Sequence, residues 1–201
     1  MCLEVCISIY YHGTSIESAR SILKNGFGAD TTIWYASYLK YVYMRKAVSP
    51  EAGEDTYNET IHSAFTTAAI CNSQENGVAI FQIEIPESLA GCVEPDDSVE
   101  YDENSYQIEA EQLNKFIADG SIKIECRVLE GYRPEFRSFV LAYTNLTQIN
   151  ISDEIKQELN TIIYNFKSYL QFSVFEWIES KYKPWESLKE LSSTTETSYF
   201  D

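Results

Sequence analysis

The stretch Tyr10-Tyr11-His12-Gly13-Thr14-Ser15 separates a segment with the period of a β-strand from a segment with the period of an α-helix. Over residues 5–9, apolar and less apolar residues alternate, which predicts a strand with one buried face. Thr14 and Glu17 then have the spacing of a capping box, and apolar residues recur at helical spacing up to Gly26. His12 and Gly13 are therefore expected in the turn between strand and helix, where backbone groups are exposed and glycine lets a ligand approach them.

The same stretch resembles a motif of known enzymes. Tyr-His-Gly-Thr-Ser, followed by Ala-Arg-Ser-Ile-Leu-Lys-Asn-Gly-Phe, looks like the first motif of ADP-ribosyltransferases of the His-Tyr-Glu class. That class includes diphtheria-toxin-like toxins, poly(ADP-ribose) polymerases and small rifampicin-modifying enzymes. The resemblance implies that His12 bonds the ribose of NAD and that the backbone of Gly13 pairs with the nicotinamide carboxamide, with Thr14 and Ser15 beside them. From the residues alone, a strand–turn–helix corner in which His12 caps a backbone group is the alternative.

A second motif of the class resembles Ile33-Trp34-Tyr35-Ala36-Ser37. The resemblance implies that Tyr35 stacks on the nicotinamide ring, and an aromatic face does hold a flat cationic ring well. A second aromatic is implied nearby, and Tyr38, Tyr41 and Tyr43 all lie in range, with Tyr41 taken as the NAD contact. Ordinary strand packing is the alternative, because the chain has 15 tyrosines.

The third motif of the class contains a catalytic glutamate, and its match here is irregular. When Tyr106 and Glu111-Gln112 are aligned with the toxin pattern, the glutamate position is occupied by Ser105. On a strand, however, Gln107 and Glu109 share one face, and they resemble the Gln-x-Glu pair of arginine-class transferases. Glu109 is therefore the preferred catalytic residue and Gln107 its partner in the NAD site, with Glu103 on a bulge or solvated carboxylates as alternatives.

Three further elements follow from periodicity. Polar and turn-forming residues over 49–57 predict a surface loop, and residues 58–72 predict a helix with Asn58 as its N-cap. A strand is predicted over residues 78–85, stopped by Pro86, and an amphipathic strand over residues 122–128.

The C-terminal part differs in character and lies beyond the resemblance. Residues 136–146 are apolar and fit a strand or a short helix, whereas residues 152–182 have helical periodicity. Pro184 ends this pattern, and a last short helix is predicted over 185–191. We expect an ADP-ribosyltransferase-like domain over residues 1–147 and a helical extension packed on it over residues 148–201.

Charge and cysteine content limit the partners and the compartment. The 201 residues include 31 acidic and 15 basic side chains, a net charge of −16, which argues against nucleic-acid and anionic-membrane surfaces and suits a basic protein partner. Five cysteines without a CxxC pair predict reduced thiols, and two histidines make a zinc site improbable. With no apolar run long enough to span a membrane and no signal-peptide pattern, a cytoplasmic protein or an effector delivered into a host cytosol is expected.

The combined expectation is an α+β fold with a split, mostly antiparallel β-sheet, flanking helices and a C-terminal helical extension. The resemblance implies an NAD-dependent mono-ADP-ribosyltransferase that needs no metal and acts on a protein acceptor, as in bacterial effectors and toxins. The alternatives are a degenerate transferase fold that works as a protein-binding module, and an NAD glycohydrolase. An RNA 2′-phosphotransferase is disfavoured, because His62, the only other histidine, lies outside any matching motif.

Overall fold

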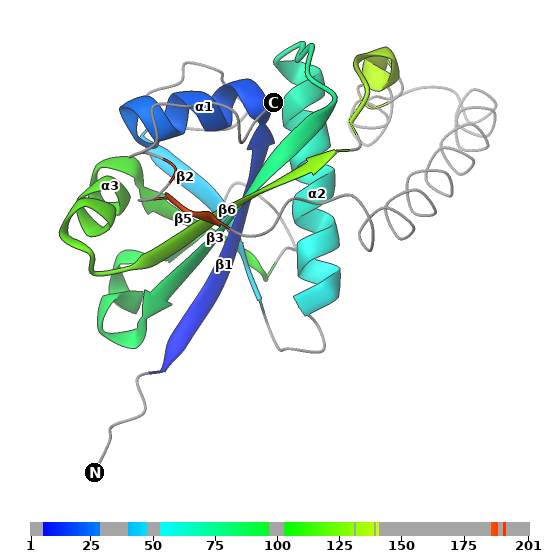
Figure 1. The fold of residues 1–201 in the computed structure, drawn as a ribbon. Helices are drawn as coiled ribbons and strands as arrows, with labels where there is room; N and C mark the ends of the chain where they lie inside the picture. Colours follow the sequence, from blue (N-terminus) through cyan, green and yellow to red (C-terminus); the bar gives the residue numbers. More distant parts are fainter. Residues whose placement is uncertain are drawn as a thin grey trace.

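A computed structural model describes residues 6–28, 40–47, 53–96, 103–130, 132–138, 140, 186–188 and 191, without the side chains of residues 53–59, 62 and 136. In these residues, seven strands form one sheet in which all neighbours are antiparallel, in the order β4-β5-β2-β1-β3-β6-β7 (Figure 1). The strands are β1 Ile7–Ser15, β2 Tyr41–Lys46, β3 Gly77–Pro86, β4 Glu94–Pro95, β5 Ser105–Glu109, β6 Lys123–Glu130 and β7 Glu186–Ser187. The helices are α1 Ile16–Asn25, α2 Gly53–Ile70 and α3 Ala110–Asp119, with short 3₁₀ helices at Glu87–Cys92 and Pro134–Phe136. The predicted α+β fold with an antiparallel sheet is confirmed at this level.

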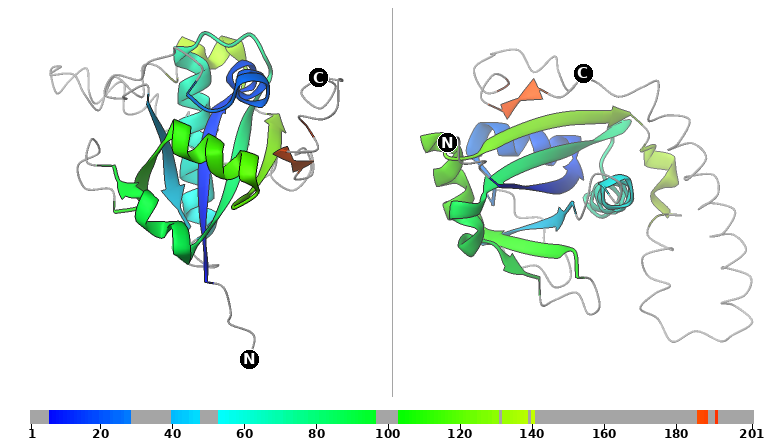
Figure 2. Two further views of the ribbon diagram at one scale, coloured as in Figure 1. Left: turned by 90° about the vertical axis from the view of Figure 1, so that its left-hand side faces the viewer. Right: turned by 90° about the horizontal axis from the view of Figure 1, so that it is seen from below.

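Helices cover both faces of the sheet. In the left-hand view of Figure 2, α3 stands in front of the sheet and α2 behind it. Alternation along β3 separates two cores: Phe81 and Ile83 pack with residues of α1 and α3, whereas Val78 and Ile80 pack with residues of α2. The structure therefore has three layers, with the sheet in the middle.

The strand β1 differs from its prediction in length and in buried face. It continues through His12 and Gly13 to Ser15 and enters α1 at Ile16, so no turn separates strand and helix. Pairing with β3 along the whole of β1 accounts for this length, since a tertiary partner overrides local turn propensity. The predicted buried face is also wrong at its start: the side of Tyr10, which is 3% exposed, faces the core, whereas Ile7 is 51% exposed.

The start of α1 is displaced by one residue from the predicted capping box. Ser15, not Thr14, is the N-cap, and its hydroxyl accepts a hydrogen bond of 3.1 Å from the backbone N–H of Ser18. Glu17 instead accepts hydrogen bonds from the Ser73 hydroxyl and the backbone N–H of Gln74, which tie the first turn of α1 to the turn before β3. The predicted end of the helix at Gly26 is confirmed.

Other boundaries were predicted with mixed success. The strands β3 and β6 lie where the alternating pattern placed them. The helix α2 begins at Gly53, so residues 53–57 of the predicted loop are helical and Asn58 is not the N-cap. The short helix predicted over 185–191 is wrong at Glu186–Ser187, which form an edge strand on β6. The helix predicted over 152–182 lies outside the described residues, and none of the helices described is long and apolar enough to cross a membrane.

Gly13 is required where β1 passes under α2, which leads to a stability prediction. A Cβ atom at Gly13 would lie 2.5 Å from the carbonyl oxygen of Thr60 and 2.9 Å from the Cβ of Ala64. We expect Gly13→Ala to lower the free energy of unfolding by about 1–3 kcal/mol, because α2 must move away from the sheet. Urea denaturation measures this, with Gly91→Ala as the control, since no atom lies within 4 Å of a Cβ there. Equal midpoints for the two variants would contradict the prediction.

Candidate functional site

The sheet opens between β1 and β2. The two strands pair only at Tyr10–Lys46 and Tyr11–Arg45, next to a hydrogen bond of 2.9 Å from the Ala47 N–H to the Ile9 carbonyl. Beyond Tyr11, β1 stays paired with β3 up to its end, and β2 stays paired with β5 along its described length. Each strand thus keeps its outer neighbour while the pairing between β1 and β2 ends.

The backbone of Gly13 faces this opening. In an antiparallel strand, the N–H and C=O of one residue point to the same side, and the side alternates from residue to residue. Because the Ile9 carbonyl binds β2, the N–H and C=O of Gly13 point to the β2 side as well. Gly13 lies two residues past Tyr11, the last paired residue, so one donor and one acceptor are presented next to each other at the edge of β1.

His12 bridges the opening through its ring. Its Nδ1 lies 2.8 Å from the backbone carbonyl oxygen of Tyr43. A carbonyl only accepts hydrogen bonds, so this nitrogen carries the proton, and in the neutral ring Nε2 is left as an acceptor. Burial lowers the pKa of His12, and the bond to the Tyr43 carbonyl opposes this in part, which favours the neutral ring at pH 7.

Two aromatic rings hold the imidazole on the other sides. The ring of Phe27 meets His12 edge-on at a centroid distance of 5.7 Å, and the ring of Phe81 lies at 6.1 Å. Phe27 and Phe81 also contact each other edge-on at 5.3 Å. The orientation of the imidazole is therefore fixed by one hydrogen bond and by two rings of the core.

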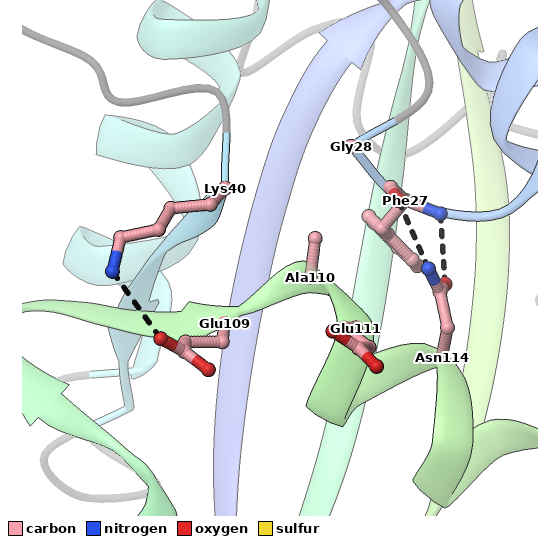
Figure 3. Close-up of a pocket in the computed structure, with 7 residues that line it drawn as sticks. All are labelled: Phe27, Gly28, Lys40, Glu109, Ala110, Glu111 and Asn114. Carbon is pink, nitrogen blue, oxygen red and sulfur yellow. Dashed lines mark hydrogen bonds and ion pairs between the residues drawn. The ribbon is translucent and has the colours of Figure 1, made fainter.

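A cavity of about 450 Å³ lies where β5 ends and α3 begins, opposite the turn that follows α1 (Figure 3). Its polar lining includes the ion pair Lys40–Glu109, whose Nζ and Oε1 are 3.3 Å apart, and the carboxylate of Glu111. Both members of the pair are more than half exposed, so the pair contributes little to stability and can rearrange. The lining residues are Phe27, Gly28, Lys40, Glu109, Ala110, Glu111 and Asn114.

An aromatic face adjoins the same cavity. The ammonium group of Lys40 lies 4.6 Å from the centroid of the Tyr41 ring, and Tyr41 is the cross-strand neighbour of Glu109. Hydrogen bonds to Tyr41 and then to Glu109 raise the pKa of Lys40. A cation is thus already held between an aromatic ring and a carboxylate at the cavity.

The structure brings some of the predicted site residues together and separates others. Glu109 lines the cavity beside Tyr41, and Gln107 is the cross-strand neighbour of Tyr43, the residue that His12 binds. His12 contacts Phe27 but does not line the cavity itself. Tyr35, the predicted stacking residue, lies outside the described residues.

The remaining predicted residues do not line the cavity. Thr14 and Ser15 are 4% and 0% exposed, and the Ser15 hydroxyl caps α1. Ser105, which occupies the glutamate position of the toxin alignment, is 7% exposed and is the cross-strand neighbour of Arg45. Glu103 lies in the turn before β5.

Sequence reasoning missed Phe27 and Asn114 as members of this site. Asn114 follows Leu113 and lies four residues after Ala110, both of which are buried, so an amide occupies the apolar stripe of α3. A polar residue at such a position signals a specific hydrogen-bond partner, because a buried amide without one is costly. The polar residue in the apolar stripe was a signal that could have singled out Asn114, but it gives no sign of what the amide binds.

No group of three or more His, Cys, Asp or Glu side chains capable of holding a metal ion occurs in the part of the chain that the structure describes. Comparisons with known protein families, with curated proteins and with solved structures found no match to this chain.

Proposed function

We propose that this chain is an NAD-dependent mono-ADP-ribosyltransferase that modifies a protein acceptor. The observation that carries the proposal is the opening between β1 and β2, with the backbone of Gly13 and the ring of His12 at its edge and the carboxylate of Glu109 in the adjoining cavity. The finer form of the fold, a sheet split in the manner of ADP-ribosyltransferases, belongs to the same proposal.

Each group has a chemical counterpart in NAD. The nicotinamide carboxamide has an acceptor oxygen and an NH₂ donor group, which complement the adjacent N–H and C=O of Gly13. The Nε2 atom of His12 accepts a hydrogen bond, so a ribose hydroxyl is its natural donor. Tyr41 has an aromatic face that already holds the Lys40 ammonium, and the charged nicotinamide ring would take the place of that ammonium.

Glu109 would act on the bond that breaks. When the C1′–N bond of NAD breaks, its electron pair leaves with nicotinamide and positive charge develops on the ribose. A carboxylate next to this charge stabilises the transition state more than the ground state, which is the requirement for catalysis. A nucleophile of the acceptor protein then forms the new bond to C1′ and loses its proton. A cavity of about 450 Å³ is within the usual range for a small-molecule site.

A non-enzymatic function is the second candidate, and one observation favours it. Ser105, which is buried and has no carboxylate, occupies the glutamate position of the toxin alignment. Glu109, the carboxylate proposed in its place, is paired with Lys40. A chain of this kind could keep the fold, lose NAD turnover and act by contact with another protein.

The test is nicotinamide release from NAD by the purified full chain, with and without a mixture of candidate acceptor proteins. With NAD labelled in its adenylate part, we expect nicotinamide in solution and label on protein. Free ADP-ribose as the only labelled product would indicate an NAD glycohydrolase. No nicotinamide release under either condition would overturn the enzymatic proposal and favour the protein-binding module.

A further inference from the structure

The side chain of Asn114 joins the two walls of the cavity. From α3 it reaches the turn after α1, where the Phe27 N–H donates to Asn114 Oδ1 at 2.8 Å and Asn114 Nδ2 donates to the Phe27 carbonyl at 2.9 Å (Figure 3). One amide thus binds both backbone groups of one residue, as a neighbouring strand would. The contact connects two segments that are 87 residues apart in the sequence.

The turn also packs closely against this amide. Gly26 has a φ of 83°, and a Cβ atom there would lie 2.9 Å from Asn114 Oδ1. The backbone of the turn therefore packs directly against the amide on the side before Phe27. The hydrogen bonds and the close packing together fix the position of the Phe27 backbone.

Phe27 transmits this position to His12. The residue is 4% exposed, and its ring contacts the rings of His12 and Phe81. The polar restraint on the imidazole is the hydrogen bond from Nδ1 to the Tyr43 carbonyl, described above. A single hydrogen bond leaves a ring free to rock about its axis, so the Phe27 ring, together with the ring of Phe81, completes the restraint.

We propose that Asn114 is a positioning residue, whose amide holds Phe27 against His12 and thereby fixes the direction of Nε2. Where the inference concerns catalysis it rests on the proposed function, but the contacts from Asn114 to His12 can be measured without NAD. Even a small misplacement of a group that orients the substrate slows catalysis. Replacing Asn114 is therefore expected to lower turnover more than an ordinary surface substitution does.

The direct test is NMR of the His12 ring in Asn114→Leu, which keeps the side-chain size but removes both hydrogen bonds. The chain has two histidines, so His62→Gln assigns the signals. We expect the His12 ring resonances to shift, because the ring current of Phe27 changes, and the pKa of His12 to rise toward its ordinary value as water reaches the ring. Gln112→Leu, a matched change on the same helix, is expected to leave both unchanged.

The conservative variant and kinetics complete the test. Asn114→Asp keeps the acceptor for the Phe27 N–H and loses the donor, so its resonances are expected between those of the wild type and Asn114→Leu. If NAD is cleaved, kcat should fall about tenfold in Asn114→Leu, with KM changed far less. If the wild type does not cleave NAD, the proposed function fails while the NMR result still decides this inference.

Unshifted His12 resonances in Asn114→Leu would overturn the inference, and so would an equal shift in Gln112→Leu. Should Asn114→Leu fail to fold, Asn114→Asp answers the same question by the same signals.

Discussion

Replacing Glu109 by glutamine is expected to slow nicotinamide release by about 10²–10³-fold without changing the fold. Glutamine keeps the shape of the side chain but removes the negative charge that would stabilise the ribose as the C1′–N bond breaks, and loss of one preorganised electrostatic group has an effect of this order. The Glu109 side chain is 57% exposed and its ion pair with Lys40 lies at the surface, so little stability depends on it. Steady-state release of nicotinamide, with circular dichroism to confirm the fold, measures the effect.

Glu111→Gln is the matched control for this variant. Glu111 lines the same cavity two residues further along the chain, on the first turn of α3. Replacing it by glutamine changes the net charge of the cavity by the same amount as Glu109→Gln. We expect a change of less than about threefold in rate, because proximity to the cavity alone does not give a carboxylate a catalytic role. An undiminished rate in Glu109→Gln would refute the assignment, and a large loss in Glu103→Gln would transfer it to that residue.

The sequence was sufficient for the elements with a simple period. The residues of β3 and β6 alternate or run apolar between turn signals, and each strand lies where this pattern placed it. The course of β1 was predicted poorly, because His-Gly-Thr has the local composition of a turn while the ladder with β3 continues through it. Local propensity carries no information about such a distant partner.

The site was predictable only in part, for a related reason. The resemblance and the strand period pointed to Tyr41 and Glu109 as site candidates, and the structure places them as cross-strand neighbours. It did not identify Phe27 or Asn114, since their contact joins α3 to the turn after α1 and has no counterpart in local periodicity. Nor did it reveal that Gly13 packs against α2, a constraint on Gly13 that is separate from any ligand.

Replacing His12 by glutamine is expected to have two effects, on turnover and on the pH dependence of stability. Glutamine can donate to the Tyr43 carbonyl and still offer an acceptor, but it lacks the rigid ring that Phe27 and Phe81 hold. We expect nicotinamide release to fall by about 10²-fold, the cost of a misplaced orienting group.

For stability, burial lowers the pKa of His12 in the folded chain below its ordinary value of 6.5. The unfolded chain therefore takes up this proton more readily than the folded chain.

The sign of the stability effect follows from that difference. Above pH 6.5 the ring is neutral in both states, so titration of His12 contributes nothing to the free energy of unfolding. As the pH falls below 6.5, protonation of His12 in the unfolded chain lowers the stability of the wild type relative to His12→Gln. This loss continues until the pH passes the folded-state pKa of His12. Urea denaturation of both proteins between pH 8 and pH 4.5 measures this difference, and the carboxylates and His62, common to both, cancel from it. The difference should stay constant above pH 6.5 and move in favour of His12→Gln below it. A difference that moves in favour of the wild type on acidification would show that the folded chain stabilises a protonated His12, and the neutral acceptor assigned to Nε2 would be wrong.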